Sequence, residues 1–502
     1  MIEKRQRQVY ISEKHYLFPY FDGITRNGTN MKNATRYRQR QVFTARGKDP
    51  SEITPNEQEI LDEFKEVTGI DLLKSKKALT FNFLYKEMQD SHNPDYYAEG
   101  FPAQTAQHIV RECVTEWDSF WAAYKEWKAN PSKFTGKPNL PGYATKGGRS
   151  TTTITNQDCK LKVDENGMCW AYFPFKKKMP LCIGMPQGTL KEVKIVPVNG
   201  IFKVCFTFDV EMEDVTPATT PDRIVAIDFG VDNLMAVTNN FGAECLLYKG
   251  GIVKSVNHFY NKKLAEIMSE EMSKPGCPLS KKGTPKFVPT KDSQTLTNKR
   301  NNRIHDFMLQ TACHFIAWCT ENRVDTIVMG VNKGWKQEVN IGKVNNQTFV
   351  GIPFSYLQSV IEYKAKEHGM NIVKQEESYT SKASFLDNDF IPVYKKDDTT
   401  KHTFSGKRKP THYKGMYKKD GFRGLYKSAD GTIINSDLNG SANILRKAFP
   451  DAFKVMPDFN RVTIIRNPQS EFIIANQMKQ AESVRTAMSK SKLKRMSRKL
   501  VA

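Results

Sequence analysis

The stretch IVAIDFGVDNLMAV, residues 224–237, decides how the second half of this 502-residue chain folds. A run of β-branched and apolar residues ends on Asp228, a glycine turn follows, and a second apolar run begins at Leu234. This pattern predicts two buried strands joined by a tight turn. A carboxylate at the inner end of a buried strand is unfavourable unless positive charge neutralises it. Asp228 is therefore a candidate site residue that needs partners.

A second acid lies far along the chain in a related setting. In TIINSDLNGSANIL, residues 432–445, a short strand leads to Asp437 and a helix follows from about Ser441. Between the two acids, the periodicity predicts helices over 296–322 and 353–368, each followed by a short strand. An acid on a first strand and an acid at the start of a late helix are typical of the metal site of an RNase H-like fold.

Carboxylates in this arrangement suit the hydrolysis of a phosphodiester. The reaction needs an activated water and a stabilised leaving oxygen, and two divalent ions about 4 Å apart serve both needs. Mg²⁺ is a hard cation that prefers oxygen ligands, so carboxylates are the appropriate residues. Either acid alone is a weak indication, because an isolated Asp at a strand end is usually a turn or cap residue. Two magnesium ions require at least one further acid.

The composition favours a polyanionic partner. Lys and Arg number 76 against 54 Asp and Glu, which gives a net charge of +22 and a pI near 9.4. Such an excess favours nucleic acid as the partner, with an anionic membrane surface as the main alternative. No apolar run approaches the roughly 20 residues of a spanning helix. The charged start, MIEKRQRQVY, lacks an export signal, and nine scattered cysteines indicate reduced thiols. We expect a protein of the prokaryotic cytoplasm, associated with the nucleoid when it is bound to DNA.

The first half of the chain predicts helices followed by strands. Residues 13 to about 135 have helical patterns punctuated by prolines, and one helix places Trp117, Phe120, Trp121 and Tyr124 on a single face. Such a face is typical of a core, although aromatic side chains also stack on bases. From about 150 to 213 the hydrophobic period becomes two, which predicts a small β-barrel or sandwich.

A loop rich in Pro, Gly and Lys connects these parts at residues 130–150. Its cations are candidates for phosphate contacts, and a solvated linker is an equally good interpretation. The candidates are Lys133, Lys137, Lys146 and Arg149.

Four stretches of the second half together resemble a known family. They are IVAIDFGVDNLMAV, NKGWKQ, EESYTSKASFLD and NSDLNGSANIL. They resemble TnpB, the transposon-encoded RNA-guided nuclease, and the compact type V CRISPR effectors, over residues 222 to 450. By this resemblance, Asp228 matches the first aspartate of the RuvC nuclease site and Asp437 matches its third carboxylate.

The resemblance implies a multidomain α+β protein. A wedge-type β-barrel (1–12 and 138–220) would carry a helical recognition lobe (13–137) and precede an RNase H-like RuvC nuclease domain (221–380 and 426–450). A small insert that binds target nucleic acid (381–425) would interrupt the nuclease domain. A basic C-terminal tail (451–502) would follow it.

The second RuvC motif departs from the family pattern. The family places a glutamate just after the strand that here reads DTIVMG, where this chain has Gly330, Val331 and Asn332. Asn332 and Glu338 are possible substitutes, but Asn is a poor ligand for this role and Glu338 lies well into the following loop. Better candidates are Glu376 and Glu377 at the end of the next strand. We favour Glu377 as the third ligand of the two Mg²⁺ ions.

The family's zinc ribbon is also absent from the sequence. Residues 378–426 contain no cysteine, and His402 and His412 cannot supply a tetrahedral zinc site. We therefore expect no zinc and an insert that holds together without metal. Nucleic-acid contacts are expected from cations of this insert, from the basic start of the long helix and from NKGWKQ. These residues are Arg408, Lys414, Arg423, Arg300, Lys333, Trp335 and Lys336.

The leading hypothesis for the function is an RNA-guided DNA endonuclease. Its partners would be a guide RNA and a target DNA, both as duplex and as displaced single strand, and it would recognise a short flanking motif. Two alternatives stay open. One is a guided DNA-binding protein without nuclease activity, and the other is a RuvC-type nuclease that needs no RNA.

Overall fold

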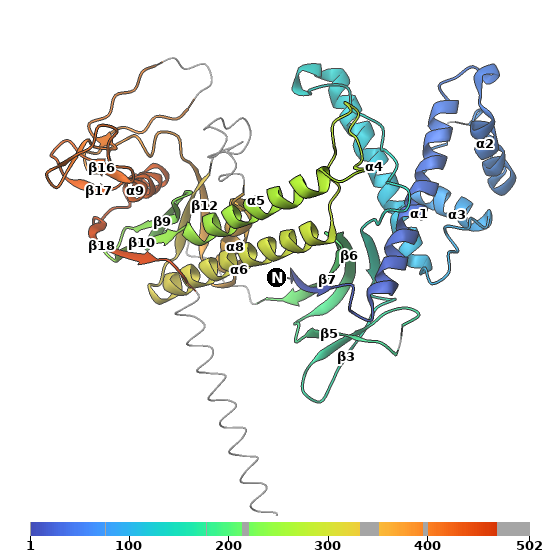
Figure 1. Ribbon diagram of the computed structural model, residues 1–502, viewed down its shortest axis with the longest axis horizontal. Coiled ribbons are helices and arrows are strands. Elements are labelled where there is room, and N and C mark those ends of the chain that lie inside the picture. The colour runs from blue at the N-terminus through green and yellow to red at the C-terminus, as the bar shows by residue number, and fades with distance from the viewer. Residues whose placement is uncertain are drawn as a thin grey trace, which may run out of the picture. The chain divides into compact units, whose positions relative to one another are not determined.

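The computed structural model describes residues 2–75, 77–176, 178–212, 220–331, 351–394 and 400–468 (Figure 1). The chain forms two compact units, residues 1–214 and 215–502, and each mixes helices with strands. The expected α+β class is confirmed. None of the helices in the described ranges is long and apolar enough to cross a membrane.

The first unit packs helices against two antiparallel sheets over one hydrophobic core. The four-stranded sheet has the order β1-β7-β6-β2, and the three-stranded sheet has the order β3-β4-β5. The helices are α1 (Phe18–Ala45), α2 (Pro55–Thr68), α3 (Phe81–Asp90) and α4 (Ala103–Ala129). The strands are β1 (Ile2–Ile11), β2 (Thr152–Thr155), β3 (Lys160–Val163), β4 (Cys169–Tyr172), β5 (Leu181–Gly184), β6 (Thr189–Val198) and β7 (Ile201–Glu211).

Strand β1 joins the two ends of this unit. It pairs with β7 along its whole length, from Ile2 opposite Glu211 to Ile11 opposite Phe202. The four helices follow β1 in sequence and return to the sheet at β2. On α4, Trp117 and Phe120 are buried as expected for a core face, but the core prediction is wrong for Trp121, which is 46% exposed.

The second unit is built on a six-stranded mixed sheet with the order β12-β11-β8-β9-β10-β18. Its strands are β8 (Ile224–Phe229), β9 (Asn233–Asn239), β10 (Glu244–Lys249), β11 (Thr326–Val331), β12 (Asn371–Glu376) and β18 (Asp458–Ile465). Its helices are α5 (Gly251–Met272), α6 (Lys291–Glu321), α8 (Phe354–Glu367) and α9 (Ser436–Ala448). The hairpin predicted from residues 224–237 is present, because β8 and β9 pair antiparallel with Asp228 opposite Ala236.

Alternate residues of β8 face different helices. Val225 and Ile227 belong to the cluster that contains the apolar residues of α6 and α8. Ile224 and Ala226 pack in a separate cluster with Ile444 of α9. Because side chains alternate along a strand, Asp228 lies on the α9 face of the sheet.

The end of the described chain differs from the expected tail. Residues Asp458–Ile465 form β18, which pairs parallel with β10 and places Val462 opposite Cys245. The exposed polar side chains of Asn460, Arg461 and Thr463 suit the edge of a sheet. A strand therefore lies within the range that the sequence assigned to the tail.

The segment between β12 and α9, which contains the expected insert, is held by a buried ring and by carboxylates. Its strands are β13 (Lys407–Arg408), β14 (His412–Tyr413), β15 (Met416–Tyr417), β16 (Leu425–Lys427) and β17 (Ile433–Asn435). Tyr426 is fully buried, and its hydroxyl donates to the Lys382 carbonyl at 2.8 Å. A Cβ at Gly406 would overlap this ring, so the backbone can pass only as glycine. Asp389 accepts hydrogen bonds from the backbone nitrogens of Ser384 and Ser405, at 2.8 and 3.0 Å.

Candidate functional site

Asp228 lies at the end of β8, directly beneath α9. A Cβ at Gly440 would clash with Asp228 Oδ2, so glycine is what lets the helix approach the carboxylate this closely. Ser441, one residue further on, donates to the Ala226 carbonyl at 2.8 Å and fixes the helix against the strand. The glycine of the motif NSDLNGSANIL thus leaves room for the carboxylate of Asp228.

Asp437 lies in the first turn of α9. The Asn435 side chain caps this helix by accepting hydrogen bonds from the backbone nitrogens of Asp437 and Leu438, at 2.9 and 3.2 Å. Asn233 Nδ2 donates to Asp437 Oδ2 at 2.7 Å, and Asn233 Oδ1 accepts from Lys249 Nζ at 2.6 Å. The carboxylate is therefore oriented by β9 and stabilised by the helix N-terminus.

Two buried asparagines of α9 hold the segment that follows β12. Asn439 Nδ2 donates to the Ala383 carbonyl at 2.8 Å, and its Oδ1 accepts from Phe385 N at 3.0 Å. Asn443 Nδ2 donates to the carbonyls of Thr380 and Ala383. These contacts fix the segment that begins with Glu376 and Glu377. Sequence reasoning did not assign a role to either asparagine, although buried amides next to a candidate acid are a usable signal.

Glu377 occupies the space beside Gly330. A Cβ at position 330 would lie 2.7 Å from Glu377 Oε2 and 2.6 Å from Ile444 Cδ1. Any larger residue at 330 would displace this carboxylate. The space that a side chain at position 330 would fill is thus taken by a carboxylate that arrives from the end of the neighbouring strand β12.

Glu376 has a different environment from its neighbour. Lys447 Nζ lies 2.7 Å from Glu376 Oε2, and Glu376 Oε1 accepts from Ser378 N at 2.7 Å. A carboxylate that is already paired with a lysine whose side chain is only 8% exposed is a poor candidate for a metal ligand. The geometry therefore favours Glu377 of the two.

The three carboxylates interact electrostatically. Burial raises the pKa of Asp228 well above its ordinary value, and the negative charges of Glu377 and Asp437 raise this pKa further, against the opposing effect of Arg408. Burial, together with the charge of Glu376, raises the pKa of Glu377 to about 7. Asp228 therefore lies close enough to Glu377 and Asp437 to respond to their charges, and such clusters of acids are typical of functional sites.

The donor set suits a hard divalent cation, although the acids are not arranged as a ready-made ion site. Within the described ranges, no group of three or more His, Cys, Asp and Glu side chains meets the geometry of a metal site. The oxygens of Asp228, Glu377 and Asp437 are nevertheless the ligand type that Mg²⁺ prefers. A cation would also relieve the repulsion that raises the pKa of Asp228.

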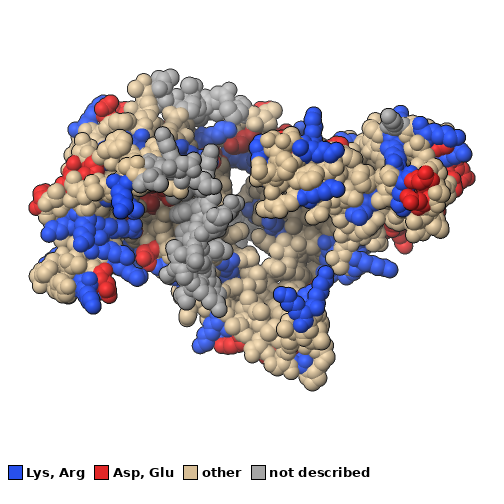
Figure 2. Space-filling view, turned by 90° about the horizontal axis from the view of Figure 1, so that it is seen from above, with Lys and Arg blue, Asp and Glu red and all other residues tan. Residues whose placement is uncertain are grey.

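A basic cavity of about 870 Å³ opens beside Asp437. It is lined by Asn233, by Asp232 and Asp437, and by the cations Lys249, Lys254, Arg408, Lys409 and Arg423. Arg408 Nη2 lies 3.6 Å from Asp437 Oδ1 and links the insert to the acids. On the face seen in Figure 2, Lys and Arg cover more of the surface than Asp and Glu do. An anionic strand fits such a cavity better than a neutral ligand does.

The remaining predicted contacts have varied surroundings. Arg300 is engaged within the protein, because its guanidinium donates to Asn257 Oδ1 at 2.8 Å and to the Gly351 carbonyl at 2.7 Å. Lys414 is exposed beside the Tyr413 ring. In the first unit, Lys137 and Lys146 are exposed, and Arg149 is ion-paired with Asp22. The remaining predicted residues lie outside the described ranges: Asn332, Lys333, Trp335, Lys336 and Glu338.

Comparison with known proteins gives two family matches. Residues 207–336 match the OrfB_IS605 family, described as probable transposases, and residues 354–444 match the Cas12f1-like TNB domain. The TnpB-like protein ORF457 of Acidianus two-tailed virus is 26% identical over 229 residues, which is 45% of this chain and 42% of that protein. The chain thus matches less than half the length of this curated relative.

Two solved structures also show similarity. A Cas12f1–sgRNA–target DNA complex matches with 14% identity and a TM-score of 0.30, covering 88% of this chain and 98% of that one. CasPhi-2 (Cas12j) bound to crRNA and phosphorothioate DNA matches with 10% identity and a TM-score of 0.34, covering 91% and 92% of the two chains. The family matches and the curated relative agree with the resemblance seen in the sequence: parts of the chain are similar to TnpB-like proteins and to the Cas12f1-like TNB domain.

Proposed function

We propose that this chain is an RNA-guided DNA endonuclease in which Asp228, Glu377 and Asp437 hold two Mg²⁺ ions. The observation that carries the proposal is the carboxylate of Glu377 beside Gly330, in electrostatic contact with Asp228. A third acid thereby joins the two that lie at the end of β8 and in the first turn of α9.

The order of the strands supports an RNase H-like nuclease domain. The series β10-β9-β8-β11-β12 has an antiparallel first half and a parallel second half, with β8 at the centre. The first acid lies on the central strand and the last on α9. In the first unit, helices inserted between β1 and β2 of one sheet suit a wedge with a helical recognition lobe.

The residues around the acids have separable roles in this proposal. Bound magnesium would activate the attacking water and stabilise the leaving oxygen. Asn233 orients Asp437, and Gly440 makes room for Asp228. The cations of the 870 Å³ cavity, Arg408 and Arg423 among them, hold the phosphates of the strand to be cut.

The proposed partners are a guide RNA and a target DNA. The TnpB resemblance and the net charge of +22 support them. Base pairing with the guide would supply most of the sequence specificity, and the protein would recognise a short flanking motif and the backbone of the heteroduplex.

Replacement of the first or the last of the three acids along the chain tests the proposal. Asp228→Ala and Asp437→Ala should each abolish cleavage of a matched target in magnesium buffer, while binding of guide and target persists. A gel cleavage assay alongside a filter-binding assay measures both quantities. Retained cleavage in either variant would remove the mechanism.

A guided binding protein without nuclease activity is the second candidate, and glycine at position 330 favours it. Glu377→Gln and Glu376→Gln, compared singly in the same assay, decide between the two. Under the endonuclease proposal only Glu377→Gln loses cleavage, by a factor on the order of 10² or more. A wild-type protein that binds its target but never cuts it would establish the second candidate instead.

The RNA that co-purifies with the protein from the cell distinguishes a guided nuclease from an RNA-independent one. Purification together with its native locus, followed by sequencing of the bound RNA, should give one discrete species. Cleavage by a preparation free of RNA would contradict guidance.

A further inference from the structure

The expected insert contains a short β-hairpin at residues 412–417. Strands β14 and β15 pair antiparallel in it, with His412 opposite Tyr417. The two residues between the strands, Lys414 and Gly415, have φ angles of 49° and 76°. Positive φ at both central positions is typical of a type I′ turn, which matches the twist of paired strands. The hairpin therefore has a definite shape of its own.

The two faces of this hairpin have different surroundings. On one face, the ring of Tyr413 packs against that of Phe422, with 5.8 Å between the ring centroids. On the other face, the rings of His412 and Tyr417 meet edge-to-face at 5.5 Å, and Tyr417 is 68% exposed. One aromatic residue thus anchors the hairpin, while another presents an open ring on which a flat group can stack.

Both ends of the hairpin segment lie at the basic cavity of about 870 Å³. Lys409 and Arg423, which precede and follow the hairpin, line this cavity. Phe422 N donates to the Pro410 carbonyl at 3.0 Å and closes the base of the segment. His412 is three residues from Lys409, which is at most about 11 Å of extended chain. About three stacked nucleotides of one strand span that distance, so a strand held in the cavity reaches the hairpin.

The local charge of this segment indicates an anionic partner. Residues 407–425 contain seven Lys and Arg side chains and one acid, Asp420. Lys414, at the turn of the hairpin, lies over the Tyr413 ring with its Nζ 5.2 Å from the ring centroid. Cations interleaved with aromatic rings are typical of surfaces that bind single-stranded nucleic acid.

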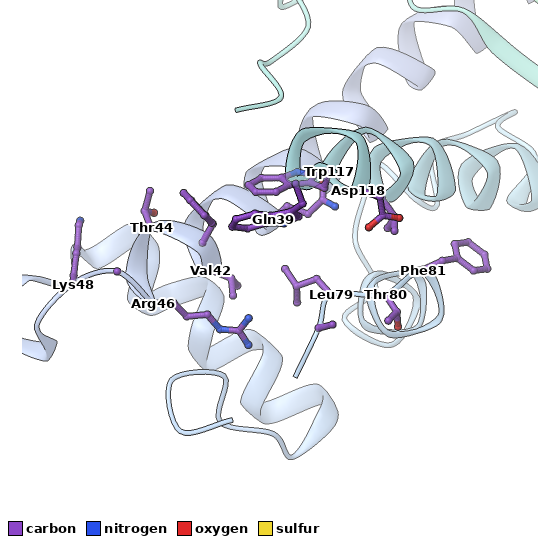
Figure 3. A pocket seen from close by; sticks show the side chains of 15 residues that line it. Gln39, Val42, Thr44, Arg46, Lys48, Leu79, Thr80, Phe81, Trp117 and Asp118 are labelled. Atoms are coloured by element: carbon purple, nitrogen blue, oxygen red, sulfur yellow. The ribbon is translucent and has the colours of Figure 1, made fainter. Parts of the chain in front are cut away.

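A larger cavity in the first unit, of about 1020 Å³, has a different character (Figure 3). Leu79 and Trp117 are among the mainly apolar side chains that line it. The cations at its edge are engaged within the protein: Arg46 donates to backbone carbonyls, and Lys48 Nζ lies 2.8 Å from Glu57 Oε1. Its local charge therefore does not indicate an anionic strand, in contrast to that of the hairpin.

We propose that the hairpin stacks the ring of Tyr417 on an unpaired base of the DNA strand whose phosphates lie in the basic cavity. An unpaired base can expose a face to an aromatic side chain, whereas neighbouring pairs cover both faces of a base inside a duplex. The hairpin therefore favours single-stranded over duplex DNA beside the three acids. The inference rests on the proposed function for the identity of the strand as DNA.

Photochemical cross-linking tests this contact directly. Full-length protein, with whatever RNA it carries from the cell, is mixed in EDTA with a short single DNA strand that contains 5-iododeoxyuridine and is then irradiated. Mass spectrometry of the digested product should place the cross-link on Tyr417 or His412, with a lower yield when the same DNA is double-stranded. Cross-links that lie only outside the hairpin, or a hairpin that is cross-linked to co-purified RNA and closed to the DNA, would overturn the proposal.

Variants separate stacking from charge. In fluorescence titrations with a short single DNA strand, Tyr417→Ala should lower the affinity about 5-fold or more, while the affinity for an abasic analogue of the strand is unchanged. Tyr417→Phe retains the ring and should retain the affinity. Arg423→Gln removes a cation of the cavity and should weaken the binding of both strands alike.

Phe259→Ala is the matched control for the loss of an exposed ring. Phe259 is 57% exposed on α5, and it does not line the basic cavity. This variant should bind both strands as wild type does, and circular dichroism verifies the folding of every variant. Wild-type affinity in Tyr417→Ala would contradict stacking, and so would an equal loss in Tyr417→Phe and Tyr417→Ala.

These measurements need no cleavage, because EDTA removes the magnesium. A protein that gives the hairpin cross-link but never cuts DNA would leave the role of the hairpin intact and remove the nuclease. A protein that cuts its target but gives no cross-link at the hairpin would do the reverse.

Discussion

Glu376 and Glu377 are adjacent acids with opposite electrostatic surroundings. Lys447 neutralises Glu376, whereas Glu377 lies beside Gly330 and interacts with the charge of Asp228. Of these two neighbouring residues, one therefore forms an ion pair and the other is a proposed metal ligand. The pKa of Glu377, raised to about 7, follows from this placement.

The raised pKa predicts a pH-dependent stability. The folded state binds the Glu377 proton more tightly than the unfolded state, whose pKa is near 4.5. The stability that this proton contributes is complete below pH 4.5 and is lost as pH rises through about 7. In the presence of a chelator at pH 8, the free energy of unfolding of Glu377→Gln should therefore exceed that of wild type by about 2 kcal/mol, and its unfolding temperature should be higher. Near pH 4.5 the two proteins should have similar stability.

Glu376→Gln is the matched control in these thermal unfolding scans. It removes the carboxylate that pairs with Lys447, so it should not stabilise the protein at pH 8. Magnesium should raise the unfolding temperature of wild type more than that of Glu377→Gln, because ligands that bind only the folded state stabilise it. Equal stability of Glu377→Gln and wild type at pH 8 would show that Glu377 is not held in a charge-opposing environment.

At the residue scale, the sequence predicted the acids better than it predicted the residues that position them. Asp228 and Asp437 follow from strand and helix patterns, and Glu377 follows from the glycine at 330; all three stay predictions as metal ligands. The contacts of Asn233 and Gly440 could not be inferred, because strand pairing and helix packing create them. Arg300 shows the opposite limit, since a cation in a basic run can be used entirely for internal contacts.

Helix α9 is the element that assembles the candidate site. It carries Asp437, covers Asp228 and fixes the segment after β12 through two asparagines. A polar motif inside a buried helix is costly unless each polar group has a partner. Here most of the polar side chains bind the backbone of neighbouring strands and loops, which explains why so short a helix carries so many.

Gly440→Ala tests this packing. The added Cβ would clash with Asp228 Oδ2, so we expect cleavage to fall on the order of a hundredfold while the protein stays folded. Gly23→Ala in α1 is the control, since nothing lies within 4 Å of a Cβ there. This control should retain full cleavage and gain about 0.5–1 kcal/mol of stability. Cleavage by Gly440→Ala at the wild-type rate would show that the close approach is dispensable.

The insert provides a second test at this scale. Tyr426 is fully buried and bonded to Lys382, so Tyr426→Ala should destabilise the insert by about 3–5 kcal/mol. Limited proteolysis should then cleave within residues 400–425 of the variant first. A zinc chelator should leave the wild-type digestion pattern unchanged, and chelator-dependent cleavage would indicate a metal in the insert.

The elements themselves were predicted to different degrees. Strong periodicity located the β8–β9 hairpin and helices α6 and α8. Strand β18 was missed because its large apolar residues, Phe459, Val462, Ile464 and Ile465, do not alternate strictly with polar ones, and because it gains its structure from pairing with β10. The pairing of β1 with β7 was likewise beyond sequence pattern, since residues some 200 positions apart form it.

At the scale of the whole molecule, charge is the property that the sequence gives most directly. The excess of 76 basic over 54 acidic residues predicts a polyanionic partner whatever the fold. The fold adds where some of this charge gathers, at the cavity beside Asp437. The composition predicts a negatively charged partner, and the structure adds a basic cavity in which such a partner could bind.

Salt dependence tests this charge. If the protein contacts six to ten phosphates, its affinity for nucleic acid should fall about 10³-fold to 10⁵-fold between 50 and 200 mM salt. Asp228→Ala should show the same slope as wild type in a fluorescence titration, because the acid is not a phosphate contact. An affinity that does not respond to salt would argue against a partner recognised through its backbone.

Strand β18 has a consequence for the boundaries of the second unit. Without it, β10 would present an unpaired row of amide and carbonyl groups, which is a template for pairing with another molecule. A version of the protein shortened after α9 would keep all three acids, but its strand β10 would be an exposed edge that can pair with another chain. Residues 458–465 thus replace the buried strand β10 at the edge of the sheet by a strand with exposed polar side chains, and a shortened version of the second unit should include them.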